Sequence, residues 1–132
     1  MNLAELVDRT SVDALDHLER ESTIPVVDGL QAQGDLIVIP FAMLADAPDQ
    51  NTSRWVPAEG IHLIAGEDGR NPHVLVADPG TCTWSAAEEQ DVAVIENTEP
   101  VYLLHPEHGG TGIAPGEWLV RRQRGSFGLV AD

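Results

Sequence analysis

The segment HVLVADPGTCTW, residues 73–84, is the clearest indication of the fold. Residues 73–77 and 81–84 are short runs rich in β-branched, aromatic and other apolar residues, which are typical of β-strands. Asp78-Pro79-Gly80 separates them and predicts a turn, because proline presets the first central φ and glycine tolerates a positive φ at the second. We therefore predict an antiparallel hairpin over residues 73–84.

Short apolar segments separated by turn residues continue on both sides of this hairpin. The predicted strands are DLIVIP at 35–40, 54–57, 61–65, 92–96 paired with 101–105, and 112–114 paired with 117–123 across Pro115-Gly116. About eight to ten antiparallel strands, with a turn about every ten residues, predict a small all-β sandwich or barrel. The connections are too short and polar for crossover helices, which argues against a doubly wound parallel sheet.

The N-terminal residues have a different pattern, which predicts a helical arm. Asn2 is a candidate N-cap with Glu5 three residues later, and leucine, valine and alanine follow at roughly helical spacing. Ser11 interrupts this pattern and is a candidate cap for a second helical segment. The segment ends before Pro25, since a residue that precedes proline is disfavoured in a helix. We therefore divide the chain into a helical arm, 1–24, and a β domain, 25–132.

The charge balance excludes several classes of function. The chain has 22 acidic residues and 7 basic residues, all arginine, for a net charge of −15. Chemistry that needs a lysine, such as a Schiff base or a phosphate-binding loop lysine, is absent. The chain also lacks the broad basic surface used for nonspecific nucleic-acid binding and the polybasic segments that attract anionic lipids. We expect no direct binding to nucleic acid or to membranes.

Cysteine content and the first residues indicate a cytoplasmic protein. Cys82 is the only cysteine, so no intrachain disulfide can form, and we expect it to be a small core residue. Residues 1–21 carry six acidic groups and no apolar run, unlike a signal or transit peptide.

Four histidines form the first candidate site: His62, His73, His105 and His108. His105 and His108 frame the segment HPEHGG, and His62 and His73 fall on neighbouring predicted strands. Imidazole is a common ligand of zinc, iron, copper and nickel, so the set is compatible with a transition-metal site in a β-barrel, with or without catalysis. The alternative, which we favour, is a solvated turn in which a histidine bonds to the backbone.

Arginines form the second candidate site, because Arg121, Arg122 and Arg124 hold three of the seven basic residues within four positions. A guanidinium binds carboxylate or phosphate bidentately, so these residues are candidates for an anionic ligand or an acidic partner. The alternative is that they pair with the excess carboxylates of the chain itself. Three tryptophans, Trp55, Trp84 and Trp118, fall in predicted strands and would mark a partner surface if exposed.

The C-terminal part of the chain resembles a family. The stretch 104–109, LHPEHG, followed by 113–124, IAPGEWLVRRQR, is similar to the ending of small uncharacterised proteins of bacteria and their phages. Residues 34–40, GDLIVIP, resemble their opening strand. Those proteins usually have an acidic residue after the last arginine, where this chain has Gly125. The resemblance implies a phage or mobile-element origin and no activity, substrate or cofactor.

These observations favour a non-enzymatic, acidic interaction protein that binds a basic surface of a partner protein, with the phage origin that the resemblance implies. Mimicry of nucleic-acid charge and a role in virion assembly are two forms of this hypothesis. The alternative is the histidine-ligated metal protein described above. We expect no cofactor under the first hypothesis and a metal such as zinc or iron under the second. Both hypotheses place the protein in the cytoplasm, of the host cell if phage-encoded, and leave oligomerisation open.

Overall fold

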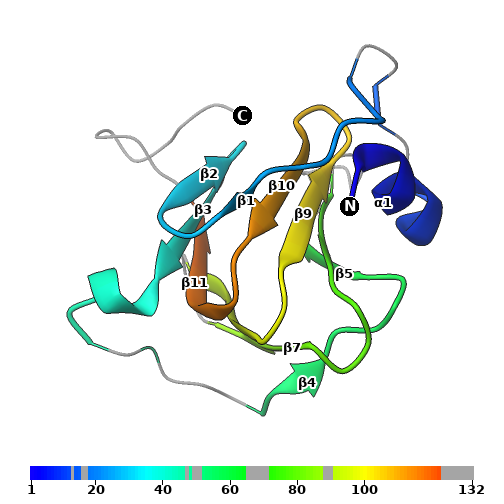
Figure 1. Cartoon of the computed structure of the whole chain (residues 1–132). Coiled ribbons are helices and arrows are strands. Elements are labelled where there is room, and N and C mark those ends of the chain that lie inside the picture. The colour runs from blue at the N-terminus through cyan, green and yellow to red at the C-terminus, as the bar shows by residue number, and fades with distance from the viewer. Residues whose placement is uncertain are drawn as a thin grey trace.

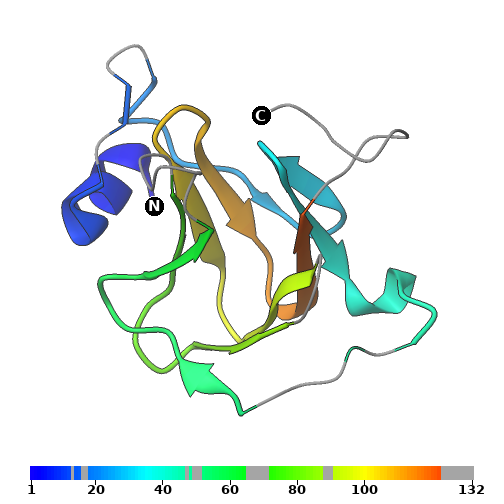
Figure 2. The same cartoon turned by 180° about the vertical axis from the view of Figure 1, so that it is seen from behind.

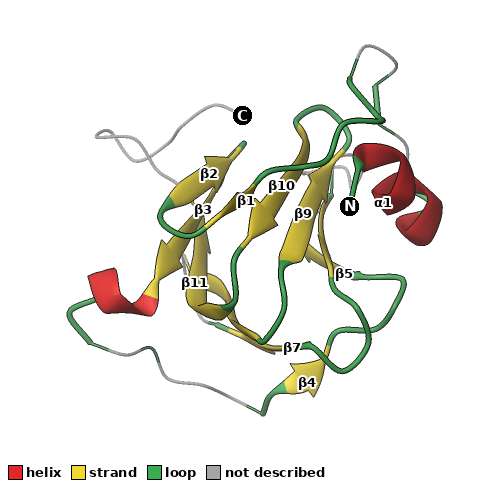
Figure 3. Ribbon diagram, in the orientation of Figure 1, coloured by secondary structure: helices red, strands yellow, loops and turns green. Residues whose placement is uncertain are grey.

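Two β-sheets pack face to face, with one helix beside them (Figure 1). The computed structural model describes residues 1–12, 14–15, 18–46, 48, 52–64, 72–87 and 91–122. One sheet has five strands in the order β1-β10-β9-β6-β5, and the other has six in the order β2-β3-β11-β8-β7-β4. The predicted all-β class with an N-terminal helix is therefore confirmed (Figure 3).

Among the described strands, the pairing is antiparallel except between β1 and β10. In chain order the elements are α1 (Leu3–Thr10), β1 (Val26–Val27), β2 (Gln31–Gln33), β3 (Leu36–Pro40), the 3₁₀ turn η1 (Phe41–Met43), β4 (Arg54–Trp55), β5 (Ile61–Ile64), β6 (His73–Val76), β7 (Cys82–Ala86), β8 (Asp91–Asn97), β9 (Val101–His105), β10 (Gly109–Ile113) and β11 (Gly116–Arg122). The short strand β1 runs parallel to β10. Gly112 allows this close approach, because a Cβ there would lie 2.7 Å from the Pro25 carbonyl oxygen and 3.0 Å from Val26 Cα.

The space between the sheets is filled by side chains that alternate inward along each strand. The buried members of this core include Leu36, Val38, Leu75, Ile95, Leu103, Ile113, Trp118 and Val120. Full burial of one such aliphatic or aromatic side chain stabilises the fold by about 1.5–3 kcal/mol. This core, which draws on both sheets, is therefore the main source of stability.

A second apolar cluster joins the helix to the outer face of the five-stranded sheet. It contains Leu3, Leu6, Ala14, Ile24, Val74, Val76 and Leu104. Asn2 caps the helix as predicted, since its Oδ1 accepts the backbone N–H of Glu5 at 2.9 Å. Because the helix covers its outer face, strand β6 is buried on both sides.

The helix is shorter than the sequence predicts. Ser11 adopts the left-handed conformation, with φ 60°, and its N–H bonds to the Val7 carbonyl, which ends the helix. The described residues that follow, 11–12, 14–15 and 18–22, are not helical, so the second helical segment predicted after Ser11 is absent from them. The chain is instead fixed to the sandwich, for example by the Leu15 N–H bonding to the Pro106 carbonyl at 2.9 Å.

The predicted hairpin over residues 73–84 is wrong, although its turn is present. Gly80 has a φ of +78°, and the Thr81 N–H donates to the Asp78 carbonyl at 3.2 Å. Strand β6, however, pairs with β5 and β9, whereas β7 pairs with β4 and β8. The turn therefore carries the chain from one sheet to the other (Figure 2).

Two other predicted hairpins are wrong for the same reason. Strands β8 and β9, and then β10 and β11, also lie in different sheets. Turns of types I and II, which Pro-Gly favours, splay the flanking strands, whereas tight hairpins prefer the mirror-image types. Consecutive strands that do pair are β2 with β3, β5 with β6, β7 with β8 and β9 with β10.

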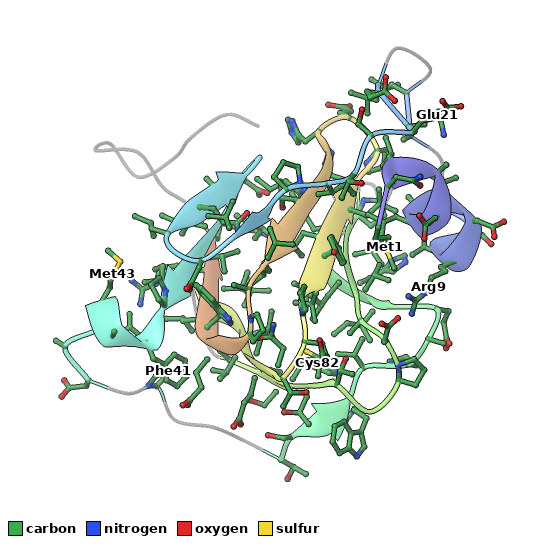
Figure 4. All side chains as sticks on the ribbon, viewed as in Figure 1. Met1, Arg9, Glu21, Phe41, Met43 and Cys82 are labelled. Atoms are coloured by element: carbon green, nitrogen blue, oxygen red, sulfur yellow. The ribbon has the colours of Figure 1, made fainter. Side chains whose placement is uncertain are left out.

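Arg9 ties the helix to the sandwich (Figure 4). Its guanidinium donates two hydrogen bonds to the Ala58 carbonyl, at 3.1 and 3.3 Å, and one to the Ala77 carbonyl at 2.7 Å. A further bond, of 3.0 Å, joins it to the carboxylate of Asp78. No helix of the described residues has the length and apolar character needed to cross a membrane.

Replacing Arg9 by glutamine should lower the free energy of unfolding by about 1–3 kcal/mol, because two backbone carbonyls lose a charged donor. Urea denaturation measures this change. As the control, Asp78→Ala removes only the ion pair of a carboxylate that is 68% exposed, and should cost no more than about 1 kcal/mol. Equal losses in the two variants would contradict the anchoring role of the carbonyl bonds.

Candidate functional site

A polar cluster occupies one end of the space between the sheets. Gln33 and Asp35 come from the β2–β3 hairpin of the six-stranded sheet, and His73 and His105 come from β6 and β9 of the other. Strand alternation explains the two histidines, because each shares the inward face with core leucines of its own strand. Both histidines are buried, with 1% and 2% exposed, so each needs hydrogen-bond partners.

His73 has an acceptor at each ring nitrogen. Its Nδ1 lies 3.0 Å from Gln33 Oε1, and its Nε2 lies 3.0 Å from Asp35 Oδ1. An amide oxygen and a carboxylate both accept, so the two bonds form together when the ring carries a proton on each nitrogen. In that doubly protonated form the ring is an imidazolium that forms an ion pair with the Asp35 carboxylate.

Gln33 fixes this arrangement by bonding across the two sheets. Its amide nitrogen donates to the Leu103 carbonyl at 2.9 Å and to the Gly109 carbonyl at 3.3 Å. Since the nitrogen faces these carbonyls, the amide oxygen must face His73. The side chain is only 4% exposed and connects β2 of one sheet with β9 and β10 of the other.

His105 makes the turn after β9. Its Nδ1 accepts the backbone N–H groups of Glu107, at 3.0 Å, and His108, at 3.2 Å. In the neutral ring this places the proton on Nε2. A histidine therefore bonds to the backbone of the segment HPEHGG, as in our favoured interpretation, although its ring is buried and not solvated.

The structure brings three of the four predicted histidines together. The ring centroids of His73 and His105 are 4.5 Å apart, and those of His105 and His108 are 4.4 Å apart. His62 lies elsewhere, exposed on the outward side of β5 and opposite Val74. Within the described residues, no group of three or more His, Cys, Asp or Glu is placed to hold a metal ion. A transition-metal site on these histidines, with zinc or iron, stays a prediction.

One of the predicted arginines approaches the same end of the sandwich. Arg122 Nε lies 3.9 Å from Asp35 Oδ2, with 44% of the arginine side chain exposed. Arg121, the residue before it, is partly buried on β11 and pairs in register with Ile37. Arg124 lies outside the described residues. An anionic ligand or acidic partner at these arginines stays a prediction, and the contact of Arg122 is with a carboxylate of the chain itself.

Sequence reasoning missed Gln33 and Asp35, which connect the two predicted sets. Both residues flank Gly34, which has a φ of +57° in the turn between β2 and β3. The signal for them was a polar interruption, Gln-x-Gln-Gly-Asp, directly before an apolar strand. Which histidine such residues contact depends on the sheet order, because 38 to 40 positions separate them from His73.

The outer face of the six-stranded sheet carries a second arrangement. The ladder register places Trp55, Thr83, Glu96 and Glu117 in one cross-strand row over β4, β7, β8 and β11. These residues face outward, since their neighbours Val56, Ile95 and Trp118 belong to the core. Trp55 is 64% exposed, and both glutamates are exposed. We call these four residues the acidic row.

The two glutamates of the acidic row conflict electrostatically. Glu96 and Glu117 are direct partners in the β8–β11 ladder, where opposite Cβ atoms lie about 4.5–5.5 Å apart. Neither carboxylate has a hydrogen bond or an ion pair with any residue that the structure describes. Like charges that face each other across a ladder are destabilising, so this arrangement has an energetic cost that no ion pair with a described residue offsets.

Cys82 is buried in the main core with 1% exposed. Burial raises the pKa of its thiol to about 12. At neutral pH the group is therefore the protonated thiol and not the thiolate, which is the nucleophilic form.

Residues 32–123 match one protein-family model, described as a domain of unknown function (DUF8820). The match covers more than two thirds of the 132 residues and runs from β2 to the end of β11. Both the polar cluster and the acidic row lie within it. No curated protein and no solved structure matches the chain.

Replacing Asp35 by alanine should lower the free energy of unfolding by about 1–3 kcal/mol, because the buried Nε2–H of His73 loses its acceptor. Asp35→Asn keeps an oxygen at the same place and should lose less. ¹⁵N NMR of the native protein should show protons on both ring nitrogens of His73. An unprotonated ring nitrogen, or an alanine variant as stable as the native protein, would contradict the proposed hydrogen bonding.

Cys82 should resist alkylation in the folded protein. With a pKa of about 12, the thiol of the native protein contains almost no thiolate at pH 8, and it is also buried. Iodoacetamide at that pH should modify it only after unfolding in urea, as measured by mass spectrometry. Modification of the native protein at the rate of an unstructured cysteine peptide would show that the site opens readily.

Proposed function

We propose that this chain, which belongs to the family of the domain of unknown function (DUF8820), is a non-enzymatic interaction protein that binds a basic surface of a partner protein. The binding surface in this proposal is the acidic row on the outer face of the six-stranded sheet. The observation that carries the proposal is the direct opposition of Glu96 and Glu117, two exposed carboxylates that form no ion pair with any residue in the described part of the chain. An arginine or lysine of a partner placed between them would relieve their repulsion. Binding would therefore recover the free energy that this repulsion costs the folded protein.

Trp55 supplies a second contact of the kind that such a partner needs. Its indole is 64% exposed at the far end of the row. A cation over an indole ring gains about 0.5–2 kcal/mol, and tryptophan is enriched among residues that dominate interface energies. Three strand spacings separate Trp55 from Glu117, or about 14 Å. This span suits two basic side chains of one extended or helical partner segment.

The remaining charge supports attraction over a longer range. Exposed carboxylates also lie on α1 and on several loops: Glu5, Asp8, Glu19, Glu21, Asp28, Asp46, Glu59, Asp78, Glu99 and Glu107. Such a field accelerates the encounter with a basic partner, while the local contacts determine where it binds. Because these groups are spread over several sides of the fold, they offer little support for mimicry of a continuous phosphate array.

The proposal covers either a regulatory or an assembly partner. It places the protein in the cytoplasm, which would be that of the host cell if a phage encodes it. Two carboxylates that oppose each other lower the stability of the fold, and residues that lower stability are typical of binding sites.

The double variant Glu96→Gln/Glu117→Gln should be more stable than the native protein and should bind basic peptides less well. Removing the repulsion should raise the free energy of unfolding by about 0.2–1 kcal/mol at low salt. An arginine-rich helical peptide should lose about tenfold in affinity, measured by calorimetry and by the fluorescence change of Trp55.

The matched control is Glu5→Gln/Asp8→Gln, which removes the same charge from exposed positions on α1. It should reduce peptide affinity by about twofold at most, since only the long-range field changes. Equal losses in the two double variants would show that binding follows net charge alone, and the proposed surface would be wrong. Trp55→Ser should weaken binding without affecting the core.

A further inference from the structure

The turn between β9 and β10 is organised by the side chain of His105. This histidine ends β9 and pairs in register with Gly109, which begins β10. Its Nδ1 accepts the backbone N–H of Glu107 at 3.0 Å and that of His108 at 3.2 Å. A ring nitrogen can accept a hydrogen bond only while it carries no proton. The closed turn therefore requires the neutral form of His105.

Two other segments are attached to this turn by hydrogen bonds. The Leu15 N–H donates to the Pro106 carbonyl at 2.9 Å, which holds the segment after α1 on the sandwich. From the six-stranded sheet, the Gln33 amide nitrogen donates to the Gly109 carbonyl at 3.3 Å. Opening of the turn would therefore loosen the N-terminal segment and weaken one link between the sheets.

The surroundings of the His105 ring oppose a second proton on it. The ring centroid lies 4.5 Å from that of His73 on β6 and 4.4 Å from that of His108, and the residue is only 2% exposed. When His73 is an imidazolium, a proton on His105 would place a second cation beside it in a buried site, which is unfavourable. The other charged groups of the described residues at this end of the sandwich are Asp35, which contacts His73, Arg122, which lies 3.9 Å from Asp35, and the exposed Glu107.

We propose that His105 is a pH-sensitive switch that releases the N-terminal segment from the sandwich in mild acid. A proton from solvent binds Nδ1, the two hydrogen bonds from the turn break, and their N–H groups turn to water. In the closed turn Nδ1 faces these two donors and no acceptor, so the protonated ring is stable only after the turn opens and water reaches it. The ordinary pKa of histidine, about 6.5, places such a change within the physiological range.

Release of this segment would change the surface of the five-stranded sheet. Ala14 belongs to the second apolar cluster, and Leu18 packs against that cluster, which includes Val74, Val76 and Leu104 of the sheet. Acid would therefore expose apolar side chains that are covered at neutral pH. The acidic row lies on the other sheet and takes no part, so this inference does not rest on the proposed function.

The test is amide hydrogen exchange, followed by NMR, on the full chain in the presence of EDTA. Below the pKa of a solvated imidazole, about 6.5, the open form binds a proton that the closed form does not, so opening should become about tenfold more frequent per pH unit. Protection of the Leu15 amide, relative to an unstructured chain, should therefore fall about tenfold between about pH 5.5 and about pH 4.5. The amide of Ile95, in the main core on β8, should keep its protection.

His105→Asn separates this switch from general unfolding by acid. The Oδ1 of asparagine can accept the same two N–H groups and takes up no proton in this range. The variant should therefore keep the Leu15 amide equally protected at both pH values. The matched control is His62→Asn, at an exposed histidine of β5, which should respond to pH as the native protein does.

Three results would overturn the proposal. In the native protein, these are a Leu15 protection that does not change with pH, or a loss of protection at Leu15 and Ile95 together, which would indicate global unfolding. The third is a His105→Asn variant that responds to pH as the native protein does. The first two need no variant, so they decide the matter even if the asparagine variant does not fold.

Discussion

The central strands of the five-stranded sheet have apolar side chains on both faces, and the rest of the fold covers them. On the inner face, Leu75 and Leu103 pack against the six-stranded sheet; on the outer face, Val74, Val76 and Leu104 pack against the N-terminal helix and the segment after it. Covering both faces removes these apolar side chains from water, and burial of apolar surface is the dominant favourable term in folding. The helix is thus part of the fold, although the family match begins at residue 32.

This covering leaves the six-stranded sheet as the one with an exposed charged row on its outer face. The opposed glutamates lie there in one cross-strand row with the exposed Trp55. The opposition of two like charges reduces stability and is not needed to complete a core. A sandwich with such a large apolar interior can retain local conflicts of about 1 kcal/mol each.

The polar cluster at the end of the sandwich has a different character. Gln33, His73 and Asp35 satisfy one another and connect the two sheets, so their hydrogen bonds contribute to stability. A satisfied buried network also specifies which strands lie opposite each other, because a slipped register would leave its donors and acceptors unpaired. Two of the histidines that the sequence offered as metal ligands, His73 and His105, form hydrogen bonds to protein groups in this structure.

Local sequence determined which segments became strands, where the chain turned and which class of fold resulted. Strands β3, β5 and β9 lie where alternating or continuous apolar runs predicted them, Asn2 caps the helix, and Gly80 takes the predicted positive φ. These features depend on interactions between residues that are close in the chain, so they can be predicted from the sequence. The acidic character and the absence of lysine also follow from composition alone.

Only the tertiary structure decided which strands pair and which side chains meet. A Pro-Gly turn reverses the chain equally well into a hairpin or into the opposite sheet, and long-range burial selects the second at residues 78–80 and 115–116. For the same reason, the contacts of His73 with Gln33 and Asp35, and that of Glu96 with Glu117, were not predictable. Each joins residues far apart in the chain, whose proximity depends on the free energy of the whole packed sandwich.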